Sequence, residues 1–164
     1  MTDPLGIYLQ DHLAGATFGL ELVERARRNN EGTEFDPSLR TLAEEIRRDR
    51  ETLLDLMRDI GVAPSRLKIA AAWGSEKARR VKPNGRLVGY TPLARVEEFE
   101  SLLLGIAGKR ALWHLLGRLD VVGRPVGRHD YAALADRAQG QLEAVEQLRV
   151  RAGEVAFVAA TART

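Results

Sequence analysis

The chain has 164 residues, of which 45% are hydrophobic and 29% charged, and its formal net charge is +2. These values are typical of one globular domain and exclude a disordered chain. The absence of cysteine excludes disulfides, thiolate catalysis and cysteine-ligated metal centres. No signal peptide and no run of about 18 apolar residues is present, so we expect a cytoplasmic protein that does not enter a membrane.

Helix starts are marked at four places by side chains that can cap backbone N–H groups. In three of them the capping residue is followed by proline, which fits the first helical turn because its missing N–H needs no partner there. Asp130 offers a fourth cap without a proline. The three cap–proline pairs are Asp3-Pro4, Asp36-Pro37 and Thr91-Pro92.

Apolar residues recur every three or four positions in four long segments, which predicts helices over about residues 4–28, 37–60, 92–119 and 131–159. A shorter helix over about residues 66–80 is predicted inside the long connection at about 61–91. The loop between the first two helices is short, so these helices are expected to be antiparallel. The predicted fold is an all-α, antiparallel four-helix bundle that forms a single domain over residues 1–164.

Five polar residues interrupt the apolar faces of these predicted helices. A buried carboxylate costs several kcal/mol unless it is paired. The residues therefore form a hydrogen-bonded network, or hold a metal or cofactor, or reach solvent because the predicted faces are rotated. If Glu100 is buried and paired, Glu100→Ala is expected to cost roughly 2–4 kcal/mol. The candidate buried polar network is His12, Asp49, Glu100, His114 and Gln141.

Four long helices with a long crossover after the second resemble the ferritin-like superfamily. Its di-iron members carry Glu-x-x-His on two helices and a single glutamate on each of the other two. Either Glu24 or Glu21, together with Glu100, could match the single glutamates. Glu45, however, is followed three residues later by Arg48, and no histidine has a glutamate three positions before it. The resemblance implies a ferritin-like topology, in a bacterial protein, without the di-iron site or another cofactor.

The predicted crossover carries a short basic cluster between two aromatic residues, Trp73 and Tyr90. Such a cluster can contact phosphates and stack on bases. The nearly balanced charge of the whole chain favours a solvated connector instead, and nucleic acid is not the expected partner. The candidate basic patch is Lys77, Arg79, Arg80, Lys82 and Arg86.

Three hypotheses for function follow. The sequence carries no catalytic motif, which favours a non-enzymatic interaction or structural protein that self-associates as a homodimer, with the alanine-rich segment at 152–160 as a candidate seam. The first alternative is a divergent ferritin-like, metal-binding oxidoreductase that uses Glu24, Glu45, Glu100 and a histidine. The second alternative is a nucleic-acid-associated protein that uses the basic crossover.

Overall fold

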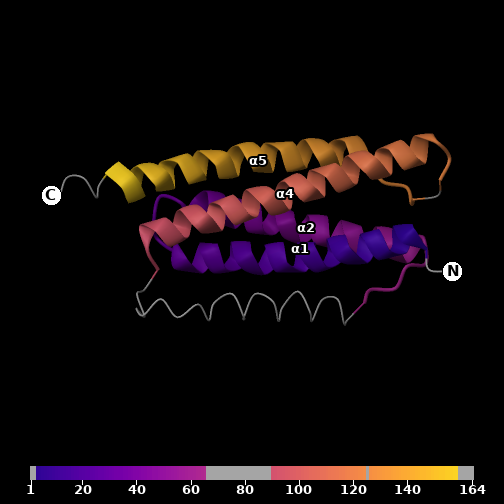
Figure 1. The fold of residues 1–164 in the computed structure, drawn as a ribbon, viewed down its shortest axis with the longest axis horizontal. Helices are drawn as coiled ribbons and strands as arrows, with labels where there is room; N and C mark the ends of the chain where they lie inside the picture. Colours follow the sequence, from indigo (N-terminus) through magenta and orange to yellow (C-terminus); the bar gives the residue numbers. More distant parts are fainter. Residues whose placement is uncertain (1–2, 66–89, 125, 159–164) are drawn as a thin grey trace.

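In the computed structural model of the protein, four long helices lie side by side along one axis (Figure 1). The structure describes residues 3–65, 90–124 and 126–158. These residues contain no strand, so the all-α prediction is confirmed for them, and none of their helices is long and apolar enough to cross a bilayer. The helices are α1 (Pro4–Asn29), α2 (Asp36–Asp59), α4 (Pro92–Val121) and α5 (Tyr131–Gly153), and α5 continues into the π-helix η1 (Glu154–Val158).

Three of the four predicted caps form as expected. In each, a side-chain oxygen accepts a hydrogen bond from a backbone N–H group in the first helical turn, which would otherwise have no partner. The cap is therefore a local property that the sequence alone predicts well. The bonds run to Asp3 from Leu5 at 3.2 Å, to Thr91 from Ala94 at 3.1 Å and to Asp130 from Ala133 at 2.9 Å.

The prediction that Asp36 caps the second helix is wrong. Asp36 is already inside α2, and Phe35 stands at the capping position without a side-chain hydrogen bond. The Asp36 carboxylate instead accepts from Arg40 Nε at 2.9 Å and from the Gly32 N–H at 3.3 Å. An arginine one turn later, at i+4, thus binds the carboxylate that was expected to bind the helix end.

The apolar spacing predicts the inward face of α2 correctly, since Leu39, Ile46 and Leu56 are buried. On α4 the spacing predicts Leu93, Val96 and Leu115 inside, and of these three only Val96 is buried. The buried residues of α4 also include Phe99, Trp113 and Leu116, whereas Leu93 and Leu115 are exposed. Leucines at neighbouring positions of α4 permit two rotations of the helix about its axis. The rotation observed is the one that buries Phe99 and Trp113, because these large aromatic side chains bury more area than leucine. This rotation decides which polar residues of α4 reach the interior.

The four helices do not pack equally closely. α4 packs most extensively against α5, and α1 against α2, whereas α1 meets α4 along a smaller contact. At one end of the bundle α1 and α4 are joined by Arg25 Nε, which donates to Glu98 at 2.7 Å. Between α1 and α2, Arg50 Nε donates to Thr17 at 3.0 Å. The contact between α2 and α5 is the smallest of the four.

Candidate functional site

A buried carboxylate lies where α2, α4 and α5 meet. Asp49 is 3% exposed, and its oxygens accept from Arg137 Nε at 2.8 Å, Lys109 Nζ at 2.5 Å and Gln141 Nε2 at 3.1 Å. The Gln141 amide also accepts from Lys109 and donates to Glu45 at 3.1 Å. These five residues, Glu45, Asp49, Lys109, Arg137 and Gln141, are called the Asp49 cluster below.

The charges of the Asp49 cluster balance, because two carboxylates face one ammonium and one guanidinium group. Burial lowers the pKa of Lys109, and the negative charge of Asp49 opposes that shift. A buried ion is tolerated when its partners satisfy it, and here each ion depends on the others for that. Asp49 has three donors on its two oxygens, so the cluster holds three helices together rather than offering an open base.

Two of the five residues predicted for a buried network, Asp49 and Gln141, lie in this cluster and bond to each other. A third, His12 on α1, is half-buried and lies elsewhere. Its ring packs edge-on against Tyr8, with the ring centroids 4.5 Å apart. Burial lowers the pKa of His12 and so favours the neutral imidazole, while the negative charge of Asp11 opposes that shift.

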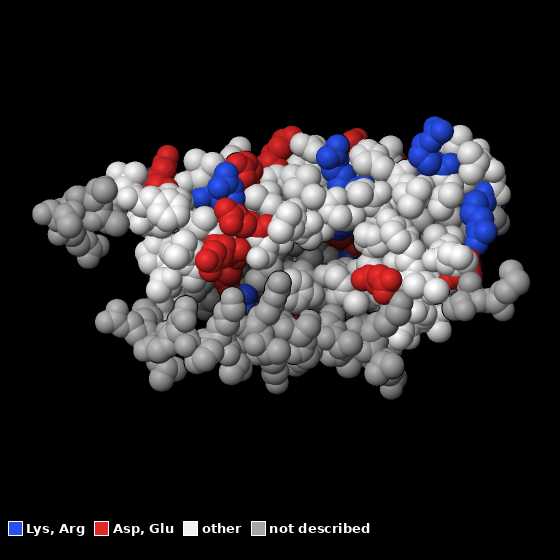
Figure 2. Space-filling model, viewed as in Figure 1, with Lys and Arg blue, Asp and Glu red and all other residues white. Residues whose placement is uncertain are grey.

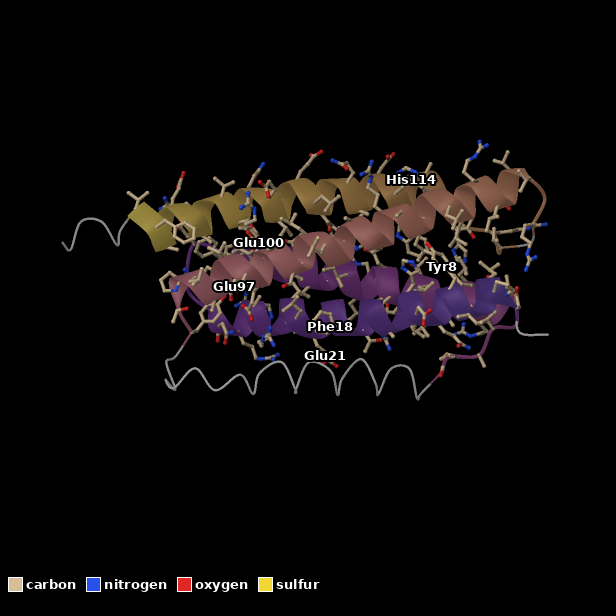
Figure 3. The ribbon with its side chains drawn as sticks, viewed as in Figure 1. Tyr8, Phe18, Glu21, Glu97, Glu100 and His114 are labelled. Carbon is tan, nitrogen blue, oxygen red and sulfur yellow. The ribbon has the colours of Figure 1, made fainter. Side chains whose placement is uncertain are left out.

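The placement of Glu100 and His114 in the interior was wrong. The Glu100 side chain is 54% exposed and pairs with Arg149 on α5 at 3.7 Å. His114 is exposed on the same helix, and Figure 3 labels both residues on α4. Both errors have one cause, which is the rotation of α4 set by its buried aromatic residues.

Three members of the Asp49 cluster were missing from the predicted network: Glu45, Lys109 and Arg137. Arg137 precedes Gln141 by four residues, so the two share one face of α5, and this spacing could have identified Arg137. Lys109 had a weaker signal, as one of only four lysines in a chain rich in arginine. Its burial depends on the orientation of α4 and could not be read from spacing.

A groove of about 540 Å³ lies directly beside the Asp49 cluster. It is bordered on α1 from Tyr8 to Leu22 and on α4 from Ser101 to Trp113, with residues of α2 between them, Asp49 included. Figure 2 shows the face of the molecule on which a hollow lies near the middle. Most of the lining side chains are apolar or absent, so the groove is an apolar channel with a charge-balanced cluster at its base.

Four glycines border the groove, two on α1 and two on α4. A methyl group placed on any of them would meet no described atom within 4 Å. Each glycine inside a helix is about 1 kcal/mol less favourable than alanine, so close packing would be its usual justification. That justification is absent for this set among the described residues, and its glycines instead keep the groove wide. The four are Gly15, Gly19, Gly105 and Gly108.

The glutamates of the metal-site hypothesis are each bonded to another side chain: Glu24 to Arg47, Glu45 to Gln141 and Glu100 to Arg149. Over residues 3–65, 90–124 and 126–158, no three histidine, aspartate or glutamate side chains are grouped so that they could hold a metal ion. The predicted basic patch lies outside the described residues. It comprises Lys77, Arg79, Arg80, Lys82 and Arg86.

Comparison with known proteins identifies no relative of the chain. No protein-family model matches the sequence, and neither a curated protein nor a solved structure matches it at a significant level. The groove and the Asp49 cluster, as the described residues form them, are therefore the features from which function can be inferred.

Proposed function

We propose that this protein is a non-enzymatic binding protein that holds an apolar molecule in the groove between α1 and α4. The observation that carries the proposal is the set of four helical glycines that border this one groove without a packing partner among the described residues. Together they cost about 4 kcal/mol of helix stability relative to alanine. Destabilising glycines are most readily retained where the space that they leave serves the function of the protein.

The polar groups at the groove favour binding over catalysis. A general base needs a lone pair that can reach a substrate proton. The oxygens of Asp49 already accept from Lys109, Arg137 and Gln141, and the Lys109 ammonium is held between Asp49 and Gln141. These groups are positioned by each other, so they shape the base of the groove and supply little reactivity.

The proposal includes an antiparallel bundle with a ferritin-like crossover but no di-iron centre. Its support is the order of contacts, since a later residue of one helix meets an earlier residue of its neighbour. Both α2 and α4 are antiparallel to α1, and α5 is antiparallel to α4. The helices α2 and α4 therefore run in the same direction, so a long connection must join them. The α1–α2 contacts pair Thr17 with Arg50 and Glu24 with Arg47. The α1–α4 contacts pair Arg25 with Glu98 and Asn30 with Arg95. The α4–α5 contacts pair Glu100 with Arg149 and Lys109 with Gln141.

Binding of Nile red, an uncharged dye that fluoresces in apolar surroundings, tests the proposal. The wild-type protein should bind one dye molecule per chain in a saturable titration. Gly15→Leu and Gly105→Leu place a side chain in the groove and should each weaken binding at least tenfold. Gly140→Leu is the matched control, because Gly140 lies on α5 away from the groove and a methyl group on it would likewise meet no described atom within 4 Å.

Two outcomes would contradict the proposal. Equal dye binding by Gly15→Leu and the wild type, with both proteins folded by circular dichroism, would place the dye elsewhere. Absence of dye binding, together with a wild-type dimer that Gly105→Leu dissociates in sedimentation experiments, would mean that a second copy of the chain fills the groove. That second result would support the predicted homodimer instead.

A further inference from the structure

The outer face of α4 carries a stripe of large apolar side chains that no described helix covers. Leu93 is 50%, Leu104 78% and Val122 69% exposed, and Leu115 lies between the last two. These four positions fall within about 40° of one another around the helix axis, since 3.6 residues complete one turn. Large apolar side chains that share one exposed face mark an interaction surface. The stripe therefore presents a docking surface along the whole of α4.

The stripe also carries opposite charges toward its two ends. Glu97 stands one turn after the first leucine, and Arg118 stands one turn before the final valine. Both residues are exposed, and neither side chain has an ion-pair partner among the residues that the structure describes. Figure 3 labels Glu97 near the beginning of α4. A partner that docks along α4 should therefore offer a cation opposite Glu97 and an anion opposite Arg118.

A second copy of α4 that runs in the opposite direction meets both requirements. A two-fold axis midway between residues 107 and 108 brings each residue opposite the one that lies equally far on the other side. At both ends of the contact a glutamate then faces an arginine. A parallel pair would instead place Glu97 against Glu97 and Arg118 against Arg118, and like charges disfavour that arrangement. The facing pairs are Leu93 with Val122, Glu97 with Arg118 and Leu104 with Ala111.

Small residues at the centre of the stripe let the two helices approach each other. Ala107 and Ala111 are exposed, and each side chain is a single methyl group. Ala111 of one copy leaves room for Leu104 of the other, so this exposed leucine is buried against a small residue. Leu115 faces Glu100, whose carboxylate pairs with α5 of its own chain. Shape and charge are therefore both complementary, as a contact between identical surfaces requires.

We infer that two copies of the chain form an antiparallel dimer through the outer faces of α4. The partner is a second copy rather than a different protein, because the stripe supplies both halves of each facing pair. The inference goes beyond the proposed function, because neither Glu97 nor Arg118 lines the groove and the dimer needs no ligand. It also differs from a dimer in which a second copy fills the groove. That dimer would depend on Gly105, which lies about 100° away from Leu104 around the helix.

Charge reversal at the two ends of the stripe tests the dimer by sedimentation equilibrium. Glu97→Arg and Arg118→Glu should each raise its dissociation constant roughly tenfold or more, because each variant creates two like-charge pairs. The double variant restores both pairs with their signs exchanged and should associate like the wild type. Glu51→Arg, at an exposed glutamate of α2, is the matched control and should leave association unchanged.

Three results would overturn the inference. A wild-type protein that stays monomeric up to about 0.1 mM would exclude the dimer. A double variant as weakly associated as the single variants would show that Glu97 and Arg118 do not face each other. A dimer that Gly105→Leu dissociates and Glu97→Arg does not would be the one that fills the groove. Nile red, which reports the groove, should bind equally to all of the charge variants, so failure of the dimer and failure of the proposed function give different results.

A single introduced cysteine tests the direction of the helices, because the chain has none of its own. Ala107→Cys lies beside the two-fold axis, so under oxidising conditions it should yield a disulfide-linked dimer. Leu93→Cys is the control, because the axis separates its two copies by about 44 Å. Cross-linking of Leu93→Cys, or a dimer in which Ala107→Cys does not cross-link, would overturn the antiparallel arrangement.

Discussion

The seam between α4 and α5 and the seam between α1 and α4 use glycine for opposite purposes. At the α4/α5 seam, a methyl group on Gly117 would lie 3.2 Å from the Tyr131 Cβ atom, so the glycine lets two helices approach. At the α1/α4 seam, Gly105 and Gly108 have no described neighbour within 4 Å. One helix, α4, therefore carries a tightly packed face and an open face, and the difference between them indicates where a ligand can enter.

The Asp49 cluster stabilises the closely packed side of the bundle, because its hydrogen bonds join α2 to both α4 and α5. Asp49→Ala should therefore give the largest loss of stability, about 3–5 kcal/mol, because it leaves the largely buried Lys109 and the partly exposed Arg137 without their carboxylate. Urea unfolding at pH 7 measures this. Asp55→Ala is the control on the same helix, because the Asp55 side chain is 56% exposed and its pair with Arg58 should contribute less than about 0.5 kcal/mol.

Replacement of the whole charged group sharpens this prediction. The triple variant Asp49→Leu, Lys109→Met and Arg137→Met removes the buried carboxylate together with both cations that it binds. It leaves only Glu45, which is partly exposed, so its stability should equal or exceed that of the wild type. In that case the cluster determines which helices pack together and contributes little to the free energy of unfolding. A triple variant as unstable as Asp49→Ala would show that the ion pairs themselves stabilise the closed seam.

The closed seam should also weaken at high pH. Tyr131 donates to the Val126 carbonyl at 2.5 Å, and burial raises its pKa to about 12, from 10. Because the pKa is higher in the folded state, this contribution to stability is complete below pH 10 and is lost as the pH rises through about 12. In urea melts between pH 8 and 12, Tyr131→Phe should be less stable at pH 8 by about 1 kcal/mol but should decline less steeply. A decline as steep as that of the wild type would contradict this.

Alanine in place of glycine tests the two seams directly. Gly105→Ala should raise the free energy of unfolding by about 1 kcal/mol, since alanine favours the helix and its methyl group meets no atom of the described residues within 4 Å. Gly117→Ala should gain less or lose, because its methyl group crowds Tyr131. Gly140→Ala, whose methyl group likewise meets no described atom within 4 Å, should behave like Gly105→Ala. Equal gains at Gly105 and Gly117 would remove the distinction between the seams.

The features that depend only on residues close together in the sequence were predictable from it. Capping by Asp3, Thr91 and Asp130 needs only the backbone of the next turn, so the sequence located these helix starts. The orientation of α4 was not predictable from periodicity, because α4 is apolar around much of its circumference. The groove was hidden for a related reason, since a glycine that admits another helix and one that leaves space are identical in sequence until the neighbours are placed.

The smallest effect is expected at Glu100, on the outer side of the α4/α5 seam. A buried Glu100 would have made Glu100→Ala costly, but its side chain is 54% exposed and 3.7 Å from Arg149, which also binds Glu146 at 2.6 Å. An exposed pair at that distance contributes little, and Arg149 retains Glu146 as its partner when Glu100 is removed. Glu100→Ala should thus change the free energy of unfolding by less than about 0.5 kcal/mol in urea melts at pH 7. A loss of 2 kcal/mol or more would mean that α4 is rotated toward the orientation predicted by periodicity, and both the open and the closed faces would then need reassignment.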